Sequence, residues 1–83
     1  MEIRILVGQN IKFYRFEKGM TQEKFCEIIK ISTNALSSIE NGKVDIRLSN
    51  LYNIANALDL DIQDLFKKNN ITSKWRVDLK DKK

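Results

Sequence analysis

The order of apolar and polar residues along the chain predicts an all-α fold. Apolar side chains recur at the three- and four-residue spacing of helices, and the chain has no proline and only three glycines. The first helix is expected to begin near Glu2 or Ile3 and to end before Gly19. Four further helices are expected at 21–30, 32–41, about 46–58 and 61–66.

The two short helices in the middle of the chain carry clear signals for their ends. Thr21 and Ser32 each precede a helical pattern, where a hydroxyl can accept a hydrogen bond from a free backbone N–H. Gly42 follows the second of these helices, and glycine adopts the left-handed conformation of a helix C-terminus without steric cost. The pattern therefore predicts two helices joined by a tight turn.

The first helix carries two apolar stripes. The stripe expected to face the core consists of Ile3, Val7, Ile11 and Tyr14. A second stripe on nearly the opposite face consists of Ile5, Phe13 and Phe16. Such a stripe is either an exposed surface that receives the C-terminal tail or a second subunit, or part of a deeper core.

The fourth and fifth helices are expected to close the core. Asp45 is a candidate cap for the fourth helix, with Arg47 in its first turn. Asp61 and Asp64 resemble a capping arrangement at the start of the fifth. The apolar stripe of the fourth helix consists of Leu48, Leu51, Ile54, Ala55 and Leu58.

The third helix differs from the others because its outer side chains are short and polar. Only Leu36 and Ile39 are large and apolar in it, whereas a helix that needs only solubility usually carries Lys and Glu. Short amides and hydroxyls can approach the base edges in a DNA major groove. Composition alone leaves two interpretations open, a base-reading face or a solvated one.

The stretch from Thr21 to Gly42 resembles the helix-turn-helix of the Cro/phage-repressor (Xre-type) family of transcriptional regulators. The match extends over most of the chain and consists of Gly8, Ile11, Tyr14, Arg15, Thr21, Gln22, Phe25, Ile31, Ser32, Leu36, Ser37, Ile39, Glu40, Gly42, Leu48, Leu51, Ile54, Ala55, Leu58, Leu65 and Phe66. The resemblance implies a five-helix, lambda-repressor-like DNA-binding domain over 1–68. The tail, 69–83, is then a candidate dimerisation or docking arm, and its apolar pattern fits a strand or a helix equally well.

The resemblance also implies roles for individual residues. Thr33, Asn34 and Ser38 match positions that read bases, and the Asn34 amide can both donate to and accept from an adenine edge. Arg15 and Glu40 are expected to form a structural ion pair between the first and third helices. Contacts to the DNA backbone are expected, by the resemblance or by charge and position, from Gln22, Lys24, Ser37, Asn41, Lys43 and Arg47.

Charge and residue content narrow the class of function. The net charge of +4 favours a polyanionic partner without demonstrating one. The chain has no histidine, and its one cysteine, Cys26, lies on a helix expected to pack, so neither an enzyme, a metal site nor a cofactor is expected. A single cysteine and the absence of a long apolar stretch suit a cytoplasmic protein.

The sequence therefore predicts a homodimeric, sequence-specific regulator of transcription that binds double-stranded DNA at a roughly palindromic operator. Relatives of this size include restriction–modification controllers and repressors of mobile elements. The alternative is a protein-interaction module of the same fold, such as an antitoxin or a domain that binds a regulator's partner.

Overall fold

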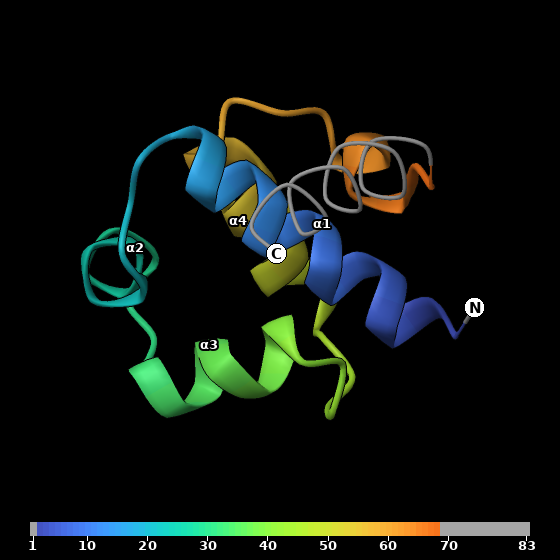
Figure 1. The fold of residues 1–83 in the computed structure, drawn as a ribbon, viewed down its shortest axis with the longest axis horizontal. Helices are drawn as coiled ribbons and strands as arrows, with labels where there is room; N and C mark the ends of the chain where they lie inside the picture. The colour runs from blue at the N-terminus through green and yellow to red at the C-terminus, as the bar shows by residue number, and fades with distance from the viewer. Residues whose placement is uncertain (1, 69–83) are drawn as a thin grey trace, which may run out of the picture.

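The computed structural model describes residues 2–68, which form four α-helices followed by a short 3-10 helix (Figure 1). The elements are α1 (Ile3–Glu17), α2 (Gln22–Ile29), α3 (Thr33–Glu40), α4 (Leu48–Ala57) and η1 (Ile62–Phe66). The all-α prediction is confirmed, and the fifth helix is of the 3-10 type. The interpretation of 69–83 as an arm falls outside the described residues.

The helices enclose one core, to which all four α-helices and η1 contribute side chains (Figure 1). Helix α1 packs against α3 and η1, α2 packs against α3 and α4, and α4 packs against η1. No helix within residues 2–68 combines the length and the apolar character needed to cross a membrane. The core side chains are Val7, Ile11, Phe25, Cys26, Leu36, Ile39, Leu51, Ile54, Ala55, Leu58 and Leu65.

The caps of α2 and α3 form as predicted. The Thr21 Oγ1 accepts from the Lys24 N–H at 3.0 Å, and the Ser32 Oγ accepts from the Ala35 N–H at 3.0 Å. Gly42 has a φ of +72°, the left-handed conformation expected after α3. These local signals fix the ends of the two helices, which makes their bounds readable from the sequence.

The start of α4 differs from the prediction. The N-cap residue is Arg47, which makes no side-chain capping bond, so Asp45 as the cap and Arg47 in the first turn were wrong. Leu48 was expected in the core but is 78% exposed. It has the right helical phase, yet it lies at the very start of α4, where the preceding Ile46 packs against the core instead.

The two stripes of α1 are also less distinct than expected. Val7 and Ile11 are buried, whereas Ile3, at the first position of the helix, is 54% exposed. On the other stripe Ile5 and Phe16 are exposed but Phe13 is buried, so this stripe is partly exposed surface and partly core, a mixture of the two alternatives that the sequence left open. Periodicity gives the direction of a side chain, and it does not give the depth of the packing around it.

Two residues of α1 set its distance to its neighbours. A Cβ at Gly8 would clash with the Ile39 carbonyl oxygen and lie 2.8 Å from that of Glu40, so only glycine allows this approach of α1 to α3. The fully buried Asn10 donates from its Nδ2 to the carbonyls of Leu65, at 2.7 Å, and Lys67, at 3.1 Å. Gly8 thus positions α3, and Asn10 holds the end of η1.

Candidate nucleic-acid interface

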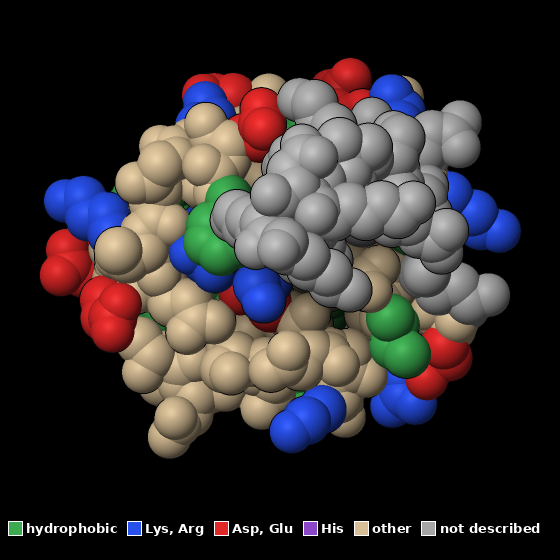
Figure 2. Space-filling view, in the orientation of Figure 1, with side chains coloured by type: hydrophobic (Ala, Val, Ile, Leu, Met, Phe, Trp, Pro, Cys, Tyr) green, Lys and Arg blue, Asp and Glu red, His purple; other side chains and the backbone are tan. Residues whose placement is uncertain are grey.

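Helix α3 lies at the edge of the described structure (Figure 1), and its outward-facing residues are mostly small and polar. Its apolar side chains, Leu36 and Ile39, point into the core. Thr33 and Asn34 are exposed and Ser38 is half-buried, so the structure brings the predicted base-reading residues to the outer side of one helix. In Figure 2 the surface over α3 is mostly tan, with few charged side chains. Small uncharged side chains allow a flat partner to approach this surface closely.

A shallow groove of about 390 Å³ runs beside this polar face. Asn34 and Ser38 line it from α3, Asp45 and Arg47 from the following loop, and Asn50 from α4. Sequence reasoning missed Asp45 and Asn50 here, because nothing in the local pattern shows that α4 begins next to α3. The exposed Asp45 lies 3.7 Å from the guanidinium of Arg4, which offsets its negative charge beside the groove.

The predicted backbone-contacting residues differ in exposure. The four with the most exposed side chains are Lys24, Asn41, Lys43 and Arg47. Ser37 is half-buried, and its hydroxyl lies 3.4 Å from the Asn41 Nδ2, which donates to it. Gln22, the first residue of α2, is also half-buried. The structure thus leaves six candidate donors at least partly accessible on α2, α3 and the loop after α3.

A buried polar cluster joins α1, α2 and α3. Arg15 donates from Nε and Nη2 to the two carboxylate oxygens of Glu40, at 2.7 and 3.1 Å, and from Nη1 to the Met20 carbonyl at 2.7 Å. The side chains of Arg15 and Glu40 are only 4% and 1% exposed. The structure therefore contains the ion pair that the resemblance implies. It adds one contact that the sequence did not indicate, because Gln22 Nε2 donates to Glu40 Oε1 at 3.0 Å.

Comparison with known proteins identifies the family. A family model described as a helix-turn-helix domain matches residues 8–71, which is most of the chain. The chain belongs to the Xre-type helix-turn-helix family. Helices α2 and α3 are its helix-turn-helix, and the groove described above lies between the second of them and the start of α4.

Three relatives illustrate what this helix-turn-helix protein is similar to. Control protein C.MunI from Mycoplasma sp is 38% identical over 66 residues, which span 78% of this chain and 89% of that protein. The restriction-modification controller protein C.AhdI from Aeromonas hydrophila is 27% identical, with a TM-score of 0.71 over 75% of this chain and 94% of that one. SinR, a master regulator for biofilm formation solved in complex with DNA, is 32% identical, with a TM-score of 0.68 over 74% of this chain and 98% of that one.

The turn of the helix-turn-helix contains a left-handed residue, Lys30, that the sequence did not predict. Lys30 ends α2 with a φ of +65°, and its N–H donates to the Cys26 carbonyl at 2.7 Å. Left-handed conformations are usually signalled by glycine or asparagine, and neither occurs at this position. The turn is therefore fixed by the packing of α2 and α3 on the core and not by a local turn signal.

The one cysteine of the helix-turn-helix is buried in the core. Cys26 is 6% exposed, and burial raises the pKa of its thiol, so the nucleophilic thiolate is disfavoured. Residues 2–68 contain no group of side chains arranged to hold a metal ion. Helix α3 presents exposed hydrogen-bonding groups and is held to α1 by the buried Arg15–Glu40 pair.

Proposed function

We propose that this protein is a homodimeric regulator of transcription that binds a roughly palindromic operator in double-stranded DNA. The observation that carries the proposal is the uncharged polar face of α3, exposed on a helix whose end is locked to α1 by the Arg15–Glu40 pair. The similarity to two control proteins and to a regulator solved with DNA supports it. C.AhdI, a restriction-modification controller protein, also favours control of restriction–modification genes as the biological role.

In this proposal α3 enters the major groove and α2 lies across the DNA backbone. Asn34 reads an adenine, while Thr33 and Ser38 bond less selectively. No Arg or Lys lies within α3, so the commonest guanine contact is missing and half-sites rich in A·T are expected at its centre. Phosphate contacts come from Gln22, Lys24, Ser37, Asn41, Lys43 and Arg47.

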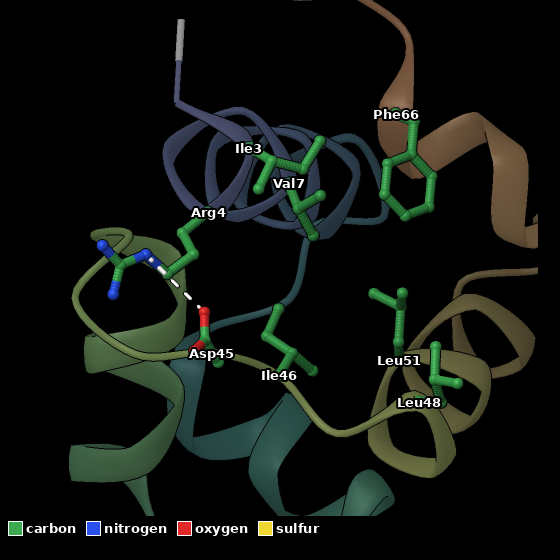
Figure 3. Close-up of a pocket in the computed structure, with 8 residues that line it drawn as sticks. All are labelled: Ile3, Arg4, Val7, Asp45, Ile46, Leu48, Leu51 and Phe66. Atoms are coloured by element: carbon green, nitrogen blue, oxygen red, sulfur yellow. Dashed lines mark ion pairs between the residues drawn. The ribbon is translucent and has the colours of Figure 1, made fainter.

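An apolar hollow of about 280 Å³ supports the dimeric state (Figure 3). Ile3 and Val7 from α1, Leu48 and Leu51 from α4, and Phe66 from η1 face one another around it. Leu48 is 78% exposed, and Ile3 and Phe66 are 54% and 40% exposed. A protruding leucine next to an apolar hollow makes a self-complementary surface, which is what a two-fold contact between identical chains requires.

The hollow also lies close to the proposed reading face. Asp45 and Ile46 line both the hollow and the groove beside α3. A second copy seated on the hollow would therefore lie next to the DNA surface. Two subunits joined there would present their α3 helices to successive turns of one duplex, about 34–36 Å apart.

Selection on random duplex DNA tests the proposal. Wild-type protein should recover an inverted repeat, and Asn34→Ala should relax one adenine position in each half-site at a cost of about 1–3 kcal/mol. Recovery of no motif by folded protein at low salt would contradict sequence-specific reading. A motif that Asn34→Ala leaves unchanged would remove Asn34 from the base contacts.

The dimer surface is tested by Leu48→Asp. The change should raise the dimer dissociation constant at least about tenfold, because losing a central buried anchor of an interface costs about 2 kcal/mol or more, and about 1.4 kcal/mol already corresponds to tenfold. The fold should survive, since the side chain is exposed in the single chain. Ile28→Asp on α2, 48% exposed and away from the hollow, is the matched control for sedimentation analysis. Equal dimerisation of the two variants would place the contact elsewhere.

The exposed hollow also favours a second candidate function, the binding of a different protein. Salt dependence distinguishes DNA binding from protein binding. DNA binding releases counterions from the duplex, and this release contributes less free energy as the salt concentration rises, so affinity for DNA falls steeply with salt. A protein contact through the apolar hollow should respond weakly to salt. Loss of partner capture in Leu48→Asp, without any DNA motif for the wild type, would favour this second function.

A further inference from the structure

We infer that Glu40 is a positioning residue for DNA binding, in addition to being the ion-pair partner of Arg15. It fixes the side-chain amide of Gln22 so that an N–H group is presented to the DNA backbone before DNA arrives. The inference rests on the proposed function and deepens it, since it assigns part of the backbone contact to a residue that touches no DNA.

The geometry begins with the carboxylate of Glu40. Arg15 occupies both of its oxygens, at 2.7 and 3.1 Å, and the Glu40 side chain is 1% exposed. The guanidinium is itself fixed, because its third donor bonds the Met20 carbonyl at 2.7 Å in the turn before α2. The carboxylate is therefore held at a defined orientation, with Oε1 turned towards the start of α2.

The chemistry of the amide follows from that orientation. A carboxylate can only accept, so Gln22 must turn its NH₂ group, and not its carbonyl oxygen, towards Glu40. One N–H bonds Oε1 at 3.0 Å, and the other has no partner among residues 2–68. Gln22 is half-buried at the first position of α2, so part of the residue stays open to solvent, and the inference places this second N–H on that part. A free glutamine on a surface would sample both orientations of its amide and would lose that freedom on binding.

Lys24, on the same helix, provides the contrast. Its side chain is exposed, and none of the hydrogen bonds or ion pairs of the described residues involves its ammonium group. Lys24 therefore offers a mobile charge, whereas Gln22 offers an oriented neutral donor. If Glu40 acts on DNA binding through Gln22, a change at Glu40 must alter the contribution of Gln22 and leave that of Lys24 intact.

A double-mutant cycle on DNA affinity tests this. Gln22→Ala should weaken binding about three- to tenfold in the wild-type background, as expected for one hydrogen bond. In the Glu40→Gln background the amide at 40 presents a donor as well as an acceptor, so Gln22→Ala should change affinity less than about twofold. Lys24→Ala should weaken binding equally in both backgrounds. It should also reduce the salt slope by about one, which Gln22→Ala should not.

Glu40→Gln leaves Arg15 without its full partner, so a second measurement uses the unmodified protein. Side-chain ¹⁵N relaxation of DNA-free protein should give Gln22 Nε2 an order parameter close to that of rigid backbone, about 0.85. Gln63, exposed on η1, is the matched control and should fall below about 0.6.

Equal mobility of the two amides would overturn the inference, as would a loss on Gln22→Ala that is unchanged by Glu40→Gln. Either result leaves the proposed function standing, provided that the wild type recovers an operator. Failure of the wild type to bind DNA would instead remove the proposed function itself.

Discussion

Two ion pairs start at the C-terminal end of α1, one from Arg15 within the helix and one from Lys18, which caps it. Arg15 pairs with Glu40 at the end of α3, and Lys18 pairs with Asp59 just after α4, each at 2.7 Å. The first pair is buried, with side chains 4% and 1% exposed, whereas the second is open to solvent at 40% and 80%. Two ion pairs of the same length thus differ widely in their exposure to solvent.

The difference reflects how much apolar surface each helix can bury. Helix α4 places Leu51, Ile54 and Ala55 in the core, so its attachment should depend little on its exposed ion pair. Helix α3 has only Leu36 and Ile39 for that purpose, because its outer residues are polar. A helix that keeps a face free for a partner lacks apolar anchors, and α3 replaces them with a buried charge pair and a close backbone approach at Gly8.

The largest effect is expected when the buried pair is broken on one side. Arg15→Met should lower the free energy of unfolding by about 3–5 kcal/mol, because it leaves the Glu40 carboxylate buried without its partner. Urea denaturation followed by circular dichroism measures this. Replacing both residues, as Arg15→Met with Glu40→Leu, should cost less than Arg15→Met alone. A double variant no more stable than Arg15→Met would show that the unpaired Glu40 carboxylate is not the cause of the lost stability.

This pair could be anticipated from the sequence, whereas the positioning contact could not. Arg15 and Glu40 were assigned by resemblance, and Thr21 and Ser32 by the local chemistry of helix caps. The contact between Gln22 and Glu40 depends on how three helices meet, and no spacing along the chain encodes it. The only indication of the contact between Gln22 and Glu40 was the Arg15–Glu40 pair, which brings the end of α3 to the turn before α2.

A smaller effect is expected from the close approach of α1 to α3. Gly8→Ala should destabilise the fold by about 1–3 kcal/mol, since the new methyl group meets backbone carbonyls that have little room to move. It should also displace the end of α3 and weaken DNA binding.

Gly19→Ala is the matched control for this change. Gly19 has a φ of +70° but no atom within 4 Å of its added Cβ, so its substitution tests backbone strain alone, worth about 1–2 kcal/mol. Gly19→Ala should leave DNA affinity unchanged in folded protein. Equal losses of DNA affinity in the two variants would show that the helix contact at Gly8 is not what sets the position of α3.

The sequence predicted which way a side chain points from its helix better than it predicted how deeply that side chain is buried. Leu48 has the helical phase of a core stripe but is exposed at the start of α4, and Phe13 is buried although Ile5 and Phe16 on the same stripe are exposed. Asn10 gave no signal, because its partners are backbone carbonyls 55 and 57 residues further along the chain. Contacts of that range depend on the arrangement of all the helices, which periodicity within one helix does not contain.

The smallest effect is expected at the exposed pair, and it should depend on pH. The hydrogen bond from Lys18 holds the pKa of the Asp59 carboxyl below its ordinary value. A carboxyl with a lowered pKa in the folded state stabilises the fold above its unfolded pKa, and this contribution disappears as the pH falls through the folded pKa.

Asp59→Asn removes the charge at a position whose φ of +58° asparagine tolerates well. The variant should therefore be slightly less stable than wild type at neutral pH and equally stable once the wild-type carboxyl is protonated. Thermal unfolding at a series of pH values measures the difference, and added salt should shrink it at neutral pH, because both side chains are exposed. A loss comparable to that of Arg15→Met would show that α4 depends on its charge pair as much as α3 does, and would remove the distinction between the two attachments.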